Sequence, residues 1–229
     1  CICIDTSSIK VGEIYFDLDG EKKYDSTINI KCRNIGDLLK RLSFIEQALI
    51  SNASPESLVF VLKPPAAQVK KSAFEKAILK RVNTGIQALF KKQYKTGISL
   101  ISGVGYGLTP SGDDFIAGFL SGLFMIEMIT GKNLSDIRET VFRESGTKNI
   151  ISKSIICYAY RGRFYEKTKG LICSLCRDGK STVMNKTMQV LKTGETSGAD
   201  FITGLLLVFY CICGYRGIIA QDRENPHTV

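Results

Sequence analysis

Residues 103–114 read Gly-Val-Gly-Tyr-Gly-Leu-Thr-Pro-Ser-Gly-Asp-Asp, and a long apolar run follows directly. Glycines let a backbone approach a ligand closely or turn where other residues are strained. Thr109 and Ser111 are residue types that cap helices, and Pro110 fits a first helical turn. A helix that begins here presents free backbone N–H groups, which attract anions, beside two adjacent carboxylates. The stretch therefore predicts the start of an apolar helix with a binding site at its N-terminus.

The pattern returns 86 residues later, between Thr196 and Gly204. The simpler explanation is that two capped core helices happen to have similar sequences. Capping alone, however, requires fewer identical residues than the two motifs share. We therefore predict that two similar helix starts meet at one end of the fold. The identical pairs are Ser111 and Ser197, Gly112 and Gly198, Asp114 and Asp200, Phe115 and Phe201, Ile116 and Ile202, and Gly118 and Gly204.

Asp114 and Asp200 are the predicted catalytic pair, with Asp113 as a third acid. Neighbouring residues on a helix point about 100° apart, so Asp113 and Asp114 cannot face one ligand equally. Asp113 also aligns with Ala199 and not with an acid, which favours a capping or supporting role. The predicted substrate-binding residues belong to the glycine loop and the two helix starts: Gly103, Gly105, Gly107, Thr109, Ser111, Gly112, Thr196, Ser197 and Gly198.

Two chemistries suit such a pair of acids. Asp114 and Asp200 would bind Mg²⁺ together with a substrate phosphate, or would work without a metal, one orienting an amide or ureido N–H and the other acting as a base. The glycine loop follows neither the P-loop pattern nor the dinucleotide-binding pattern. The single histidine, His227, lies in a polar tail, so no serine–histidine arrangement is readable.

Composition narrows the class of protein. The chain has 229 residues, 44% of them hydrophobic, and a formal net charge of +9, which suits an anionic ligand or an acidic partner. The basic residues are scattered and no nucleic-acid motif is present, so nucleic-acid binding is not expected. In the C-terminal half the nearest basic candidates for an anion are Lys148, Lys153, Arg161 and Arg163, although solvation of the surface explains each of them.

Membrane insertion and secretion are not expected either. The apolar runs from Phe115 to Ile126 and from Phe201 to Tyr215 are shorter than the ~20 residues that span a bilayer. No signal peptide is readable, and the 8 cysteines suit a reducing compartment, where they serve as core thiols. We expect a cytoplasmic protein.

The periodicity predicts an α+β fold, with a small N-terminal β element and flanking helices followed by a C-terminal helical bundle. The parts are residues 1–100 and residues 101–229, which also suit one continuous domain. Expected strands are Cys1–Asp5, Gly12–Leu18, Tyr24–Cys32 and Leu58–Leu62, with a hairpin turn at Asp19-Gly20. Expected helices are 35–50, 72–91, 113–130, 134–144, 149–160, 165–177, 181–192 and 198–215.

The two motifs, Gly103 to Phe115 and Gly194 to Asp200, resemble those of a bacterial family of formerly unknown function. This family includes a subunit of oxamate carbamoyltransferase, an enzyme of anaerobic allantoin degradation. The resemblance implies small anionic substrates: oxalurate and phosphate are interconverted with oxamate and carbamoyl phosphate. It also implies two further subunits, one of which resembles acyl-CoA synthetases.

The resemblance brings no set of catalytic residues with it, so the site residues above are inferred from the motifs. The sequence lacks the Ser-x-Arg-Thr helix start of ordinary carbamoyltransferases. Two other functions therefore stay open. One is a Mg²⁺-dependent hydrolase of a phosphorylated or ribosylated ligand, by analogy with helical hydrolases that pair acids around metals. The other is a non-catalytic scaffold subunit whose basic surface docks an acidic partner.

Overall fold

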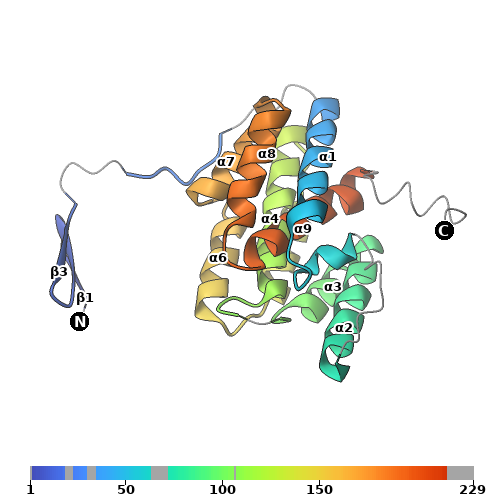
Figure 1. Ribbon diagram of the computed structural model, residues 1–229, viewed down its shortest axis with the longest axis horizontal. Helices are drawn as coiled ribbons and strands as arrows, with labels where there is room; N and C mark the ends of the chain where they lie inside the picture. The colour runs from blue at the N-terminus through green and yellow to red at the C-terminus, as the bar shows by residue number, and fades with distance from the viewer. Residues whose placement is uncertain (1, 19–22, 30–34, 63–71, 106, 216–229) are drawn as a thin grey trace, which may run out of the picture.

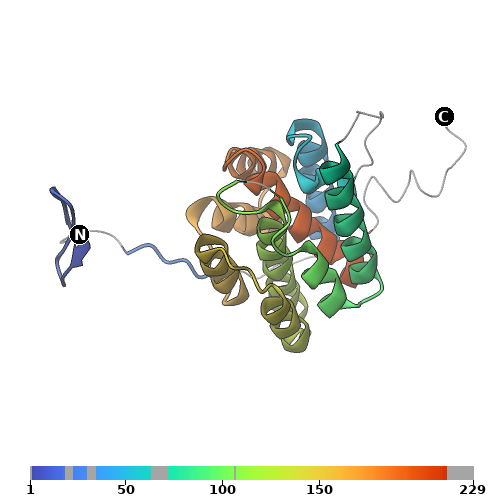
Figure 2. The same cartoon turned by 90° about the horizontal axis from the view of Figure 1, so that it is seen from below.

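The computed structural model describes residues 2–18, 23–29, 35–62, 72–105 and 107–215. A small antiparallel sheet precedes a body made of helices, so the expected α+β class is confirmed (Figure 1). The helices pack around two central ones, and the sheet stands apart from them in both ribbon views (Figure 2).

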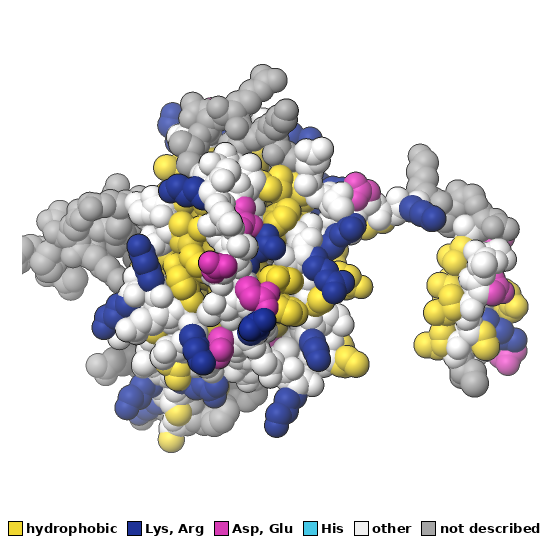
Figure 3. All heavy atoms as spheres, turned by 180° about the vertical axis from the view of Figure 1, so that it is seen from behind, with side chains coloured by type: hydrophobic (Ala, Val, Ile, Leu, Met, Phe, Trp, Pro, Cys, Tyr) yellow, Lys and Arg dark blue, Asp and Glu magenta, His cyan; other side chains and the backbone are white. Residues whose placement is uncertain are grey.

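The sheet contains β1 (Ile2–Ile4), β2 (Ser8–Val11) and β3 (Ile14–Asp17), in that order. Ile2 pairs with Val11 and Ile4 with Ile9. Directly opposite residues share a face, and the register therefore gathers the apolar side chains of all three strands on one side. Most of these side chains are exposed, and Figure 3 shows apolar side chains on the surface of the sheet.

The predicted strands differ from the observed ones. Gly12 has a φ of 60° and forms the turn between β2 and β3, which is where the hairpin lies; Asp19-Gly20 falls outside the described residues. The strand predicted for Tyr24–Cys32 is wrong over its described part. There the Asp25 carboxylate accepts hydrogen bonds from the backbone and the hydroxyl of Thr27, which bends the chain, and only Thr27 makes a bridge, with Arg163.

The predicted helices are confirmed with small shifts at their ends. The body contains α1 (Ile35–Asn52), α2 (Ala73–Phe90), α3 (Tyr94–Ile101), α4 (Ser111–Thr130), α5 (Ser135–Glu144), α6 (Ile150–Tyr160), α7 (Glu166–Arg177), α8 (Lys180–Leu191) and α9 (Ser197–Cys213). Only α3 was not predicted. None of the helices that the structure describes has both the length and the apolar character that crossing a membrane requires.

The two helices that carry the motifs, α4 and α9, form the centre of the body. Both are buried over most of their length, as expected for helices that are apolar nearly all round. They cross at a pair of glycines. A Cβ atom at Gly118 would lie 1.9 Å from the carbonyl oxygen of Phe201, and one at Gly204 would lie 2.0 Å from that of Phe115. The same offset of 86 residues relates both contacts, so the crossing is pseudo-symmetric.

Helices from the first part of the chain pack directly on this centre. α1 contacts α7, α8 and α9, and α3 contacts α4 and α5. The prediction of a strand at Leu58–Leu62 is wrong. Leu58–Val61 forms a short 3-10 helix, η1, which packs against α9 and α4. Periodicity alone does not separate a short apolar run of this kind from a strand.

Candidate functional site

The N-termini of α4 and α9 meet at one end of the body. Thr109 Oγ1 lies 3.2 Å from Ser197 Oγ, and Ser111 Oγ lies 3.3 Å from Thr196 Oγ1. Each helix places a hydroxyl before its first turn and another at its first residue, and each of these hydroxyls meets one from the other helix. Two helix starts with parallel dipoles at one point create a local positive potential, which favours negative charge there.

The glycine loop owes its shape to positive φ angles. Gly103, Gly105 and Gly107 have φ values of 69°, 110° and 99°. At Gly105 the space is also closed, because an added Cβ would lie 2.8 Å from the backbone nitrogen of Ser111. The loop therefore folds tightly over the start of α4 only because these residues lack side chains.

Asp114 lies beneath the hydroxyls and is only 6% exposed. Thr109 Oγ1 donates a 2.8 Å hydrogen bond to its Oδ2. Burial raises the pKa of Asp114 to about 6. Hydrogen bonds from the hydroxyls of Ser197 and Thr109 lower this pKa, and the negative charge of Asp113 raises it further.

Asp200 is completely buried. The backbone N–H of Leu58, in η1, donates a 2.6 Å hydrogen bond to Oδ1. The other oxygen, Oδ2, accepts no hydrogen bond from the described residues, although the hydroxyls of Ser111 and Thr196 are near enough to lower the pKa of this carboxyl. Burial outweighs them and, with the charge of Asp114, raises the pKa of Asp200 to about 7.

The carboxylates are thus placed reciprocally. Asp114 of α4 is near the first residue of α9, Ser197, and Asp200 of α9 is near the first residue of α4, Ser111. The two acids act on each other electrostatically, since the charge of Asp114 raises the pKa of Asp200. A pair of this kind near neutral pH readily holds one proton between two carboxyl groups.

Asp113 has a different environment from its neighbour. Its Oδ1 accepts a 2.8 Å hydrogen bond from the backbone of Gly103, and its Oδ2 accepts one of 2.6 Å from the hydroxyl of Thr147. Both oxygens of this buried side chain are therefore used to fasten the glycine loop to the segment before α6. These contacts favour a positioning role for Asp113.

Sequence reasoning missed several residues around the site. Leu58 and Thr147 contribute a backbone N–H and a hydroxyl from distant segments, and Asn149 Nδ2 donates a 2.7 Å hydrogen bond to the carbonyl of Leu108. Tyr165 lies near Asp114. Its partial burial, and to a smaller extent the negative charge of Asp114, raise the pKa of the Tyr165 phenol to about 12. Only Asn149 carried a signal, as a residue type that caps helices, at the start of the helix predicted for 149–160.

The basic candidates named from the sequence do not reach the carboxylates. Lys148, Lys153, Arg161 and Arg163 are exposed, and none of them contributes to the pKa of Asp114 or Asp200. Arg163 borders a small hollow with Tyr165 and Phe201 that has room for about one water molecule.

In the described part of the chain, no group of three or more His, Cys, Asp and Glu side chains is arranged to hold a metal ion. The acids that converge are the two carboxylates Asp114 and Asp200, with hydroxyl oxygens around them.

A comparison with protein families identifies one match. Residues 101–209, which span both motifs and the helices between them, match the family described as oxamate carbamoyltransferase subunit AllH. Neither the curated proteins nor the solved structures contain a match.

Proposed function

We propose that this chain, whose residues 101–209 match the family of oxamate carbamoyltransferase subunits, binds the reacting groups of that enzyme where α4 and α9 begin. The substrates would be oxalurate and phosphate in one direction, and oxamate and carbamoyl phosphate in the other. The glycine loop and the two helix starts would hold the anionic groups. Asp114 and Asp200 would act on the carbamoyl group.

The observation that carries the proposal is the reciprocal placement of the two buried carboxylates under a layer of hydroxyls. Burying two acids that act on each other's charge is costly, and a fold that only needed capped helices would not require it. Thr109, Thr196 and Ser197 are partly exposed, so a ligand at the surface would meet hydroxyls first. Protons would then pass between the ligand and the carboxylates through these hydroxyls.

The chemistry needs one base and one acid. A phosphate oxygen attacks the ureido carbonyl carbon of oxalurate while the proton of hydrogenphosphate passes to Asp114, the more acidic of the pair. The bond from that carbon to the oxamate nitrogen breaks, and the nitrogen takes the electron pair and a proton from Asp200. The products are carbamoyl phosphate and oxamate, and transfer of the proton from Asp114 back to Asp200 restores the pair. Proton transfer of this kind contributes about 10²–10⁴-fold to a rate.

The second candidate is a Mg²⁺-dependent hydrolase, which the unpartnered Oδ2 of Asp200 favours. Asp114 and Asp200 are oxygen ligands of the kind that Mg²⁺ accepts, and one or two carboxylates with substrate phosphates are a usual set. Bound there, the ion would neutralise the pair and polarise a phosphate oxygen. The family match favours the transferase.

Reconstitution tests the proposed reaction. We expect the chain, assembled with the other subunits of the transferase, to form carbamoyl phosphate from oxalurate and phosphate in the presence of EDTA. The rate should be highest between about pH 6 and about pH 7. Below this window both carboxyls are protonated and the base is lost; above it both are ionised and the acid is lost.

The control is the same assembly without this chain, which should be inactive. Activity that EDTA abolishes and Mg²⁺ restores would instead support the metal-dependent candidate. An assembly that contains the chain and forms no carbamoyl phosphate under any of these conditions would contradict the proposed function.

A further inference from the structure

Within the described residues, no positive side chain acts on the two carboxylates that the substrates would meet. The charges that act on the pKa values of the pair are themselves negative: Asp113 acts on Asp114, and Asp114 acts on Asp200. No Lys or Arg of residues 35–62, 72–105 and 107–215 contributes to either value. Oxalurate, phosphate and carbamoyl phosphate are all anions, and sites for such groups usually contain a Lys, an Arg or a metal ion.

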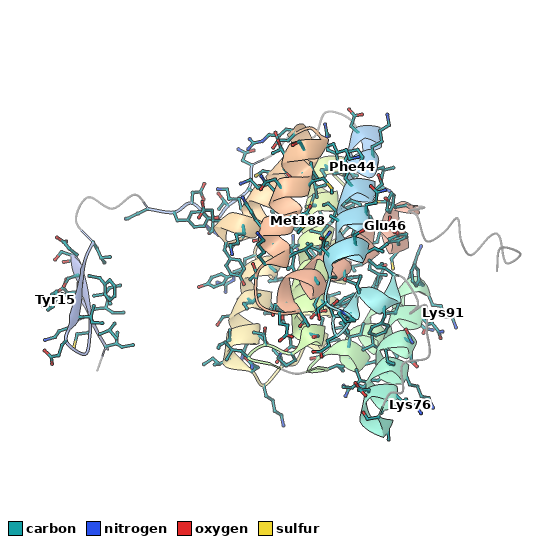
Figure 4. The ribbon with its side chains drawn as sticks, viewed as in Figure 1. Tyr15, Phe44, Glu46, Lys76, Lys91 and Met188 are labelled. Carbon is teal, nitrogen blue, oxygen red and sulfur yellow. The ribbon has the colours of Figure 1, made fainter. Side chains whose placement is uncertain are left out.

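Some of the basic residues lie on another side of the molecule. Lys76 on α2 and Lys91 directly after it are exposed, on the side of the body opposite α6 (Figure 4). On the face drawn in Figure 3, the Lys and Arg side chains are spread over the surface and do not gather into one patch.

An apolar surface borders the site. In the described helical body, Phe90 is the one strongly exposed large apolar or aromatic residue outside this region; the others are Leu108, Ile150, Ile151, Tyr158 and Tyr165. Leu108 is 74% exposed and Ile150 is 79% exposed. We call Leu108, Ile150, Ile151 and Tyr165 the apolar rim.

The rim is fixed to the site by hydrogen bonds and not only by proximity. Asn149 donates to the carbonyl of Leu108 and accepts from the backbone N–H groups of Ile151 and Ser152, which joins the glycine loop to the start of α6. Tyr165 lies near Asp114. Exposed apolar side chains that are held rigidly around a polar centre are typical of protein–protein interfaces.

We propose that another subunit of the transferase covers the apolar rim and places a Lys or Arg side chain over Asp114 and Asp200, so that the active site is shared between two chains. This inference rests on the proposed function, because it assigns the missing cation of that site to the partner. The site offers the complementary charge: two carboxylates and an oxygen, Oδ2 of Asp200, that is buried and accepts no hydrogen bond in the described structure. The family description, which names a subunit, agrees with such a partner.

The arrangement also explains how the acids would be used. In the chain alone, a substrate anion would meet two carboxylates without a compensating positive charge, which opposes binding. A partner's cation would bind the anion and the ionised carboxylate together. Chemistry would then be confined to the assembled enzyme, where the rim excludes water.

The test uses surface variants of the full chain and measures assembly and activity separately. Leu108→Asp and Ile150→Asp place a charge on the rim, and Phe90→Asp places the same charge on an exposed apolar residue outside it. We expect each rim variant to weaken the affinity for the other subunits at least tenfold, since central interface residues carry most of the binding energy. Phe90→Asp should bind normally, and a high concentration of the partners should restore the activity of Ile150→Asp.

Inorganic phosphate tests the shared site. The full assembly should bind phosphate at millimolar concentration, and the isolated chain should not. Normal assembly by both rim variants, or phosphate binding and turnover by the isolated chain, would overturn the proposal. A fully assembled enzyme without transferase activity would instead contradict the proposed function, while the affinities of the variants would still decide whether the rim is an interface.

Discussion

Replacing Asp200 with Asn is expected to reduce carbamoyl transfer by about 10²–10⁴-fold and, at the same time, to make the protein more stable. The pKa of Asp200 is about 7 in the folded protein, against a usual 3.8. The folded state therefore binds a proton that the unfolded state releases, and this proton's contribution to stability is lost as the pH rises from about 4 to about 7. An amide carries no charge and avoids this loss.

The upper limit of the gain in the free energy of unfolding is about 1.4 kcal/mol for each unit by which the pKa of Asp200 is raised. We expect a gain of about 2 kcal/mol at pH 8, which is less than this limit because the amide must also find hydrogen-bond partners. Its oxygen can still accept from the backbone N–H of Leu58, and its NH₂ group lies near the hydroxyls of Ser111 and Thr196. Urea unfolding of both proteins at pH 5 and pH 8 measures the difference, which should be small at the lower pH.

Asp113→Asn is the matched control, one residue from the other acid of the pair. Both oxygens of Asp113 accept hydrogen bonds, from Gly103 and Thr147, so an amide NH₂ would face a donor. This variant should lose about 1–3 kcal/mol of stability. If Asp200→Asn were also destabilising at pH 8, Asp200 would be a structural residue like Asp113, and the proposed role of the pair would be wrong.

Gly118→Ala is expected to destabilise the fold strongly. The new Cβ would lie 1.9 Å from the carbonyl oxygen of Phe201, so α4 and α9 would have to move apart along the whole crossing. The expected cost is about 3 kcal/mol or more, and an insoluble product fits the same expectation. Gly204→Ala should behave in the same way, because its Cβ would lie 2.0 Å from the carbonyl oxygen of Phe115.

Gly170→Ala in α7 is the control for this substitution. There the nearest atom to an added Cβ is Cδ of Lys186 at 3.4 Å, an ordinary contact on a flexible side chain. Alanine favours helices over glycine by about 1 kcal/mol, so this variant should be as stable as the unmodified protein or more so. Equal melting temperatures for Gly118→Ala and Gly170→Ala would contradict the close crossing of the two central helices.

The helices and the meeting of the two motifs could be predicted from the sequence because both depend on local signals. Periodic apolar residues and capping residues mark the ends of the helices, and the repeat of Ser111, Gly112 and Asp114 as Ser197, Gly198 and Asp200 predicts two similar starts. The same glycines that repeat between the motifs, Gly118 and Gly204, are those that let the helices cross.

Other parts of the site depend on distant contacts and leave no local signal. Leu58 donates to Asp200 through its backbone, which any residue except proline would supply, and its apolar surroundings suggest a strand. The different environments of Asp113 and Asp114 depend on Thr147, which lies far along the chain. It is equally unreadable from the sequence that the basic candidates Lys148 and Arg163 do not act on the carboxylates.

A crystal structure of the assembled enzyme with oxamate and carbamoyl phosphate tests the central claim most directly. We predict that the carbamoyl group lies at the joined starts of α4 and α9, within hydrogen-bonding distance of Asp114, Asp200 or the hydroxyls that cover them. A ligand bound elsewhere, with the two carboxylates still enclosed among Thr109, Ser111, Thr196 and Ser197, would contradict it.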